Sequence, residues 1–157
     1  VTLKWPNDVM AEHGKVAGIL AEGSRGHVVV GCGINVSVPQ ADLPVPTATS
    51  VDVERGLETT DAVALADKIA ADIVRGVLHR VAALAAAGGA ASAAGLSAEV
   101  NTACSTIGRH VRVSLPGDRV LTGVAIGLDA SGATLVTTDD GATTAVHAGD
   151  VTHLRYE

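Results

Sequence analysis

Turn signals recur at nearly regular intervals after Gly108, and this pattern constrains the fold more than any other feature of the sequence. The runs between these turns are short and rich in Val, Leu, Ile and Thr, as is typical of β-strands. The expected strands span residues 110–115, 120–128, 134–138, 143–147 and 151–155. Short strands joined by tight turns predict a small β-barrel at the end of the chain.

The residues before this series combine strand and helix patterns, so we expect a domain boundary near Thr106. Residues 1–5 form an apolar run that predicts a strand. Residues 16–20 and 27–36 are rich in Val, Ile and Leu, and the turn-forming residues 23–26 separate them. These two runs predict a β-hairpin.

A long helix is expected between the hairpin and the barrel. Residues 39–58 contain three prolines and are interpreted as loop, and residues 59–61, two Thr and an Asp, follow as candidate N-caps. Apolar residues then recur at intervals of three and four, at Val63, Ala66, Ile69, Ile73, Val77 and Val81. This spacing predicts an amphipathic helix that lies on a sheet and ends near Gly88, followed by a short second helix up to about Glu99.

Charge and hydrophobicity exclude two classes of partner. The 157 residues carry a net charge of −6, and their eleven Lys and Arg residues are scattered, which disfavours a nucleic-acid surface. No run approaches the roughly 18 apolar residues that a membrane span needs, and no signal peptide pattern opens the chain. We expect a cytoplasmic protein with no membrane partner. Because Val1 already lies inside a strand, we also expect N-terminal truncation.

The composition limits how the core is built. The sequence has no Phe, one Trp and one Tyr, so Ala, Val and Leu must supply most of the core. Cys32 and Cys104 lie far apart and outside any CxxC pattern, and we expect both to be small core residues rather than disulfide partners. The six His residues lack the spacing of metal ligands, so they predict no metal site.

The sharpest local motif is Lys4-Trp5-Pro6-Asn7-Asp8, where a strand runs into a proline and two short polar residues. The strand must stop there and present these side chains at its end, which is where ligands often meet a scaffold. An ordinary Asx turn explains the same residues, so local chemistry leaves both interpretations open.

The hairpin suggests a second functional feature. If Glu22 faces Val28 in the hairpin, the residue numbers of each facing pair add up to fifty. Lys15 then faces Asn35 at the open end of the hairpin. The same register sets Ala17 opposite Gly33 and Ile19 opposite Gly31, on the face that carries Lys15. A trough floored by glycine would suit a planar or phosphate-bearing ligand. Strand glycines that mark bulges, with Lys15 as a solvated flank, remain the alternative.

Three segments in this order, residues 4–8, 15–22 and 31–36, closely resemble biotin protein ligases. That family also ends in a small SH3-like barrel, which the strands after Thr106 resemble more loosely. The resemblance implies an α+β fold, with residues 1–106 as the C-terminal part of a catalytic domain related to class II aminoacyl-tRNA synthetases. Residues 107–157 would form the barrel.

The resemblance also implies an activity: ATP and Mg²⁺ activate biotin as biotinyl-5′-AMP, which is transferred to a lysine of a biotin carboxyl carrier protein or an acyl-CoA carboxylase subunit. By similarity, Lys15 and Asp8 are the catalytic residues. Lys15 would contact the biotin carboxyl and the adenylate, and Asp8, the candidate Mg²⁺ ligand, would organise the metal or the incoming amine. No other metal ligand is implied. The remaining binding residues implied are Trp5, Asn7, Gly18, Gly31, Gly33 and Asn35.

Two parts of the family's pattern are missing from these 157 residues: the Gly- and Arg-rich loop that closes over biotin and the adenylate phosphate, and an upstream Ser-Thr-Asn segment. We therefore expect the chain to be inactive on its own. Two alternatives stay open at this point, a bifunctional ligase that also represses transcription and a non-catalytic binding module. The sequence does not identify the acceptor protein or the oligomeric state.

Overall fold

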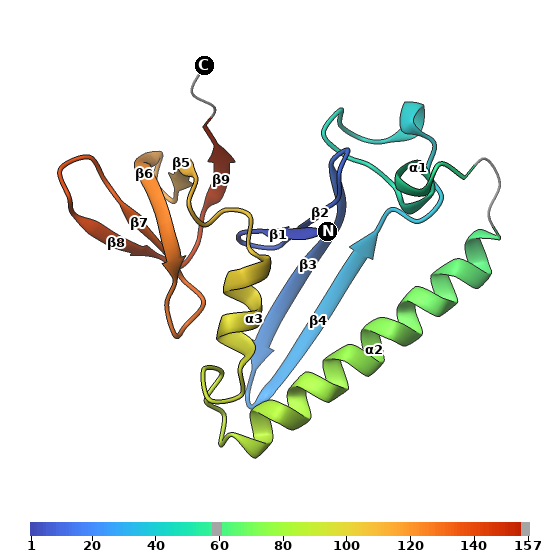
Figure 1. Cartoon of the computed structure of the whole chain (residues 1–157), viewed down its shortest axis with the longest axis horizontal. Helices are drawn as coiled ribbons and strands as arrows, with labels where there is room; N and C mark the ends of the chain where they lie inside the picture. Colours follow the sequence, from blue (N-terminus) through green and yellow to red (C-terminus); the bar gives the residue numbers. More distant parts are fainter. Residues whose placement is uncertain (58–60, 155–157) are drawn as a thin grey trace. The chain divides into compact units, whose positions relative to one another are not determined.

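The computed structural model describes residues 1–57 and 61–154 of the chain (Figure 1). Thr59 and Thr60, proposed above as helix caps, and Arg155, at the end of the last expected strand, lie outside the described residues.

The chain folds as two compact units. The N-terminal unit comprises Val1–Thr2 and Asn7–His79, and the C-terminal unit comprises Leu3–Pro6 and Arg80–Glu157. The short stretch Leu3–Pro6 therefore belongs to the C-terminal unit, although most of the N-terminal unit follows it in the sequence.

The first sheet has four strands, in the order β1-β2-β3-β4. Its strands are β1 (Thr2–Lys4), β2 (Asp8–Met10), β3 (Lys15–Ser24) and β4 (His27–Ile34). The predicted first strand and the hairpin of β3 and β4 are confirmed. The short strand β2 was not predicted, because a proline followed by Asn and Asp reads locally as the end of regular structure.

The predicted register of the hairpin is wrong by one residue. The turn has only two central residues, Arg25 and Gly26, both with positive φ (43° and 84°), so Ser24 pairs with His27. Such turns match the twist of the flanking strands, whereas our prediction assumed a loop of five residues. Because side chains alternate between faces, the shift changes every facing pair. Gly18 therefore lies opposite Gly33, and Leu20 opposite Gly31.

The segment interpreted as loop, residues 39–58, contains two short helices. They are η1 (Gln40–Asp42) and α1 (Val51–Arg55). Ser50 caps α1, because its Oγ accepts a hydrogen bond from the Val53 N–H at 3.3 Å, and Gly56 ends the helix with φ of 61°. Ser before the first turn and Gly after the last are the usual signals of a helix, and the prolines ahead of them obscured these signals.

The long helix α2 (Ala62–Ala86) is confirmed, and Asp61 caps it by accepting a hydrogen bond from the Ala64 N–H at 3.0 Å. None of its residues is buried, and Val63 and Leu78 are 72% and 63% exposed. Of the predicted apolar stripe, Ile69 and Ile73 are half-buried whereas Val77 and Val81 are exposed, so the stripe is only partly covered in the part of the chain that the structure describes. Within residues 1–57 and 61–154, no helix is long and apolar enough to cross a membrane.

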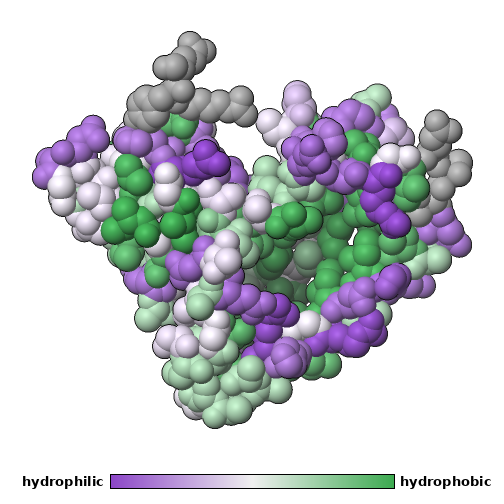
Figure 2. Space-filling view, viewed as in Figure 1, coloured by the Kyte–Doolittle hydropathy of each residue, from purple (hydrophilic) through white to green (hydrophobic). Residues whose placement is uncertain are grey.

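The hairpin also carries exposed apolar side chains. Leu20, Val28 and Val29 are each about 70% exposed (71%, 68% and 71%). Figure 2 shows hydrophobic surface over β4, bordered by the charged side chains of α2. Such a patch is typical of a surface that another polypeptide segment covers.

The C-terminal unit contains α3 (Leu96–Ala103) and an antiparallel sheet in the order β8-β7-β6-β5-β9. The strands are β5 (His110–Leu115), β6 (Arg119–Leu128), β7 (Thr134–Thr137), β8 (Thr143–Val146) and β9 (Asp150–His153). All five predicted strands are confirmed. A short second helix is present, but it begins at Leu96 and ends at Ala103, later than the expected end near Glu99. The strands could be predicted because glycines mark the turns between them: Gly117, Gly132 and Gly141 all have positive φ.

The core of the C-terminal unit is built largely from valine, as the absence of Phe predicted. Val111, Val113 and Val136 are fully buried. Cys104 is buried in this core, but Cys32 is exposed on β4, so the prediction that both cysteines are core residues is wrong for Cys32. Both thiols are free.

Candidate ligand-binding site

An ion pair joins the two charged residues that the sequence singled out. Asp8 begins β2 and lies directly opposite Gly18 on β3. The Nζ of Lys15 lies 2.5 Å from the Oδ1 of Asp8. The ammonium group also lies above Gly18, because a Cβ added there would be 3.4 Å from both Cε and Nζ of Lys15. Gly18 thus leaves the space through which the lysine side chain reaches Asp8.

An irregularity in strand pairing gives Lys15 this direction. Val9 pairs with Ala17, but Met10 pairs with Lys15, so the register shifts by one residue between these pairs. Such a bulge re-aims the side chains next to it. The Lys15 side chain is 43% exposed and that of Asp8 only 17% exposed, so the cation stays accessible while its partner is largely covered.

A cavity of about 830 Å³ opens beside this pair within the N-terminal unit. Six of the residues proposed from the sequence line it, namely Asn7, Lys15, Gly18, Gly31, Gly33 and Asn35. A volume of this size is in the range of small-molecule pockets. The structure therefore brings together most of the proposed binding residues.

Glycine forms the floor of this cavity, although by a different pairing from the one predicted. Gly18 pairs with Gly33, and Gly31 lies two residues before Gly33, so all three are on one face of the hairpin. A Cβ added at Gly31 or Gly33 would meet no atom within 4 Å. The floor is thus open main chain that a flat ligand can approach closely.

The segment after the proline-rich loop forms part of the wall, which sequence reasoning missed. Pro44, Val45 and Ala48 line the cavity. This segment is fastened to Lys15, whose N–H donates to the Thr47 carbonyl at 2.8 Å and whose carbonyl accepts from the Thr49 N–H at 2.9 Å. An isolated parallel bridge of this kind has no local sequence signal.

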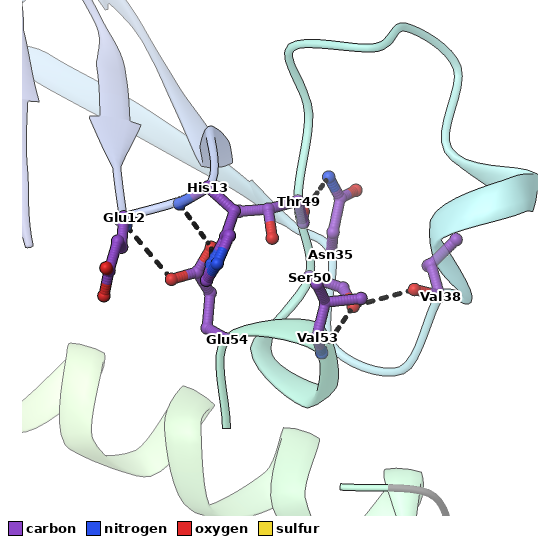
Figure 3. A network of polar contacts seen from close by, with 8 residues as sticks. All are labelled: Glu12, His13, Asn35, Val38, Thr49, Ser50, Val53 and Glu54. Carbon is purple, nitrogen blue, oxygen red and sulfur yellow. Dashed lines mark hydrogen bonds and ion pairs between the residues drawn. The ribbon is translucent and has the colours of Figure 1, made fainter. Parts of the chain in front are cut away.

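Asn35 helps to hold the same segment in place. Its side-chain Nδ2 donates to the carbonyl of Thr49 at 2.9 Å (Figure 3). Its backbone N–H donates to the Val16 carbonyl at 3.0 Å. The side-chain nitrogen of Asn35, a binding residue implied by the resemblance, therefore already has a partner in the scaffold. In this structure Asn35 connects the end of β4 to the wall of the cavity.

Trp5 does not line this cavity. Its indole belongs to the core of the C-terminal unit, where it is 7% exposed. Its Nε1–H donates to the Gly132 carbonyl at 3.0 Å, and its backbone N–H donates to the Thr106 hydroxyl at 3.0 Å. The motif thus divides after Pro6, so that Trp5 packs in one unit and Asn7 and Asp8 lie in the other.

No cluster of three or more His, Cys, Asp or Glu side chains arranged to hold a metal ion occurs among residues 1–57 and 61–154. The Asp8 carboxylate pairs with Lys15, which lines the cavity.

Gly14, just before Lys15, offers a test of how tightly this site is packed. A Cβ at Gly14 would overlap the carbonyl oxygen of Thr47 and come within 2.9 Å of its carbon. We expect Gly14→Ala to lower the free energy of unfolding by about 1–3 kcal/mol, because backbone atoms cannot yield as a flexible side chain can. Denaturant unfolding measures this. The control is Gly23→Ala in β3, where a Cβ would meet nothing within 4 Å, and an equal loss in both variants would contradict the close approach.

Both ends of the chain match known protein families. Residues 1–37 match the biotin/lipoate A/B protein ligase family, and residues 106–154 match the biotin protein ligase C-terminal domain. These two segments contain the motif residues and the five-stranded sheet respectively.

Two curated relatives are both named biotin–[acetyl-CoA-carboxylase] ligase. A biotin–[acetyl-CoA-carboxylase] ligase of Mycobacterium tuberculosis is 39% identical over 153 residues, covering 98% of this chain and 53% of the relative. The enzyme of the same name from Paracoccus denitrificans is 45% identical over 65 residues, covering 36% of this chain and 27% of the relative. The chain thus spans about half the length of the first of these relatives.

Among solved structures, a biotin protein ligase from Aquifex aeolicus in complex with biotin and ATP has the same fold. It superposes with a TM-score of 0.73 at 23% identity, covering 99% of this chain and 62% of that protein. The chain therefore carries segments that match two biotin protein ligase domain families, and a ligase of that name aligns along nearly its whole sequence.

Proposed function

We propose that this chain forms one side of the active site of an enzyme that activates biotin with ATP and then attaches it to a lysine of a biotin carboxyl carrier protein or carboxylase subunit. The observation that carries the proposal is the ammonium of Lys15 above Gly18, at the edge of a glycine-floored cavity. The match of residues 1–37 to the biotin/lipoate A/B protein ligase family supports it, as does the Aquifex aeolicus structure solved with biotin and ATP.

The chemistry explains why a cation is needed at this position. In the first step a biotin carboxylate oxygen attacks the α-phosphorus of ATP, biotinyl-5′-AMP forms and pyrophosphate leaves. Two anions must approach each other, so a preorganised ammonium lowers the barrier by offsetting their repulsion. We assign this role to Lys15, which is accessible and held by a partner on the neighbouring strand.

In the second step the amine of the acceptor lysine attacks the carbonyl of biotinyl-5′-AMP, and AMP leaves with the electron pair of the broken bond. The attacking amine must lose a proton, and Asp8 is our candidate to receive or orient it. Its side chain is 17% exposed and already pairs with the ammonium group of Lys15. Asn7, Gly31, Gly33 and Asn35 would position the ligand against the cavity floor.

The family also implies Mg²⁺. Magnesium is usually held by one or two carboxylates together with substrate phosphates and water, and Asp8 offers such a carboxylate beside the cavity. When bound, the ion would neutralise charge on the phosphates of ATP.

We further propose the finer division of the chain, with residues 1–106 as part of a catalytic domain related to class II aminoacyl-tRNA synthetases and residues 107–157 as an SH3-like barrel. The match of residues 106–154 to the C-terminal domain family supports this boundary. No observation favours either a transcriptional repressor or a non-catalytic binding module.

The proposal is tested with the protein that carries this chain, incubated with biotin, Mg²⁺ and radiolabelled ATP. We expect labelled biotinyl-5′-AMP, followed by biotinylation of an added carrier domain. The 157-residue chain alone should form little adenylate, because it spans 53% of its relative and leaves apolar surface of β3 and β4 uncovered. Absence of adenylate with the carrying protein, while it is folded, would refute the proposed reaction.

A further inference from the structure

A carboxylate distant in sequence fastens the turn that leads into Lys15. Residues 11–14 connect β2 to β3, and within this turn the Ala11 N–H donates to the Gly14 carbonyl at 2.8 Å. Glu54, on α1, reaches the same turn from about forty residues further along the chain. Lys15 follows the turn directly, so the turn sets where β3 begins.

Glu54 binds the turn with both of its oxygen atoms. Oε2 accepts from the Glu12 N–H at 3.0 Å, and Oε1 accepts from the His13 N–H at 3.0 Å. The His13 ring Nδ1 also lies 3.2 Å from Oε1 (Figure 3). Two backbone N–H groups that point at one carboxylate form a bidentate, charge-assisted contact, which fixes orientation as well as distance.

The environment of Glu54 keeps this carboxylate ionised. Burial alone would raise its pKa, but the nearby Thr49 hydroxyl and the hydrogen bonds from His13 and Glu12 outweigh burial, so the pKa of Glu54 is lowered from its usual value. The Thr49 hydroxyl faces the carboxylate without the geometry of a regular hydrogen bond. A lowered pKa means that the contact is complete near neutral pH and is lost only as the pH falls through that lowered value.

The helix that carries Glu54 is itself anchored to the wall of the cavity. Ser50 caps α1 and its hydroxyl donates to the Val38 carbonyl at 2.7 Å, while the Val51 N–H donates to the Asn35 carbonyl at 2.9 Å. The preceding residue, Thr49, holds the carbonyl of Lys15. One short segment, residues 47–54, therefore forms hydrogen bonds with the backbone of Lys15 and, through the Glu54 carboxylate, with the backbone of the preceding turn.

We propose that Glu54 is a positioning residue for the adenylation reaction, acting through Lys15. The carboxylate fixes the turn at residues 11–14, and the turn fixes the strand start from which the lysine extends over Gly18. Glu54 itself does not line the cavity. This inference rests on the proposed function of Lys15.

The test uses the protein that carries this chain. In Glu54→Gln one oxygen is replaced by a hydrogen-bond donor, which cannot accept from a backbone N–H, so we expect kcat for adenylate formation to fall about tenfold with little change in the KM for ATP. The matched control is Glu12→Gln in the same turn, because only the backbone of Glu12 takes part in the contact. The control should retain wild-type rates.

Two further measurements separate positioning from a general loss of stability. In a Lys15→Ala background, Glu54→Gln should have no additional effect, since a residue that acts through Lys15 has nothing left to act on. Amide exchange at Glu12 and His13 should accelerate about tenfold or more in Glu54→Gln, while the β5–β6 amides of the C-terminal unit stay protected.

Additive losses in the double variant, or unchanged rates in a folded Glu54→Gln protein, would overturn the positioning role. If the wild-type protein makes no adenylate, the proposed function fails instead, and the exchange experiment still reports whether Glu54 holds the turn.

Discussion

Replacing Lys15 by alanine in the protein that carries this chain should reduce adenylate formation by about thirtyfold to several thousandfold, corresponding to roughly 2–5 kcal/mol. The structure supports this large effect because the ammonium meets a largely covered carboxylate, Asp8, at 2.5 Å and borders the cavity. Removing the lysine takes away the ammonium that pairs with Asp8 and leaves the attacked phosphate without the neutralising charge of Lys15. A solvated surface lysine would cost little.

Variants of the same residue refine this expectation. Lys15→Arg keeps the charge but replaces a compact ammonium with a planar guanidinium, which the space above Gly18 does not match, so we expect partial rescue. Lys68→Ala is the control, because Lys68 is 73% exposed on α2 and pairs with Asp72 at its own helix surface. Adenylation rates that are equally intact in folded Lys15→Ala and Lys68→Ala would remove Lys15 from the proposed site.

The sequence predicted elements best where local chemistry decides them. The strands after Gly108 were found because positive-φ glycines must fall between them, and the helix of residues 62–86 because its apolar spacing is regular. The register of the hairpin was missed because Arg25, a residue that seldom takes positive φ, occupies the two-residue turn. A single residue of loop length then changes which glycines face each other.

Sequence motifs predicted which residues belong to the site, whereas the contacts that hold these residues in place became visible only in the folded structure. The motifs singled out Asn7, Lys15 and Gly18, and all three line the cavity. The wall formed by residues 44–48 and the contact from Glu54 depend on chain segments that meet only after folding. No periodicity or turn signal reports such long-range contacts, so sequence reasoning had no means to find them.

Trp5 belongs to the sequence motif but does not line the cavity. The family motif contains it, but its ring is buried among Cys104, Val111 and other core residues of the C-terminal unit. We expect Trp5→Ala to lower the free energy of unfolding by about 3–5 kcal/mol, the usual cost of removing a large buried aromatic side chain. Denaturant unfolding followed by circular dichroism measures it. Val120→Ala, at a 49% exposed position in β6, should cost far less.

Trp5→Phe distinguishes packing from ligand contact. Phe refills most of the volume but cannot donate to the Gly132 carbonyl, so we expect a loss of about 1 kcal/mol in stability and no change in the KM for biotin or ATP. The wild-type chain adds an independent readout, because Trp5 is its single tryptophan. Its fluorescence should report unfolding of the C-terminal unit. A folded Trp5→Phe protein with a severalfold higher KM for biotin would return Trp5 to the ligand site and contradict its assignment to the core.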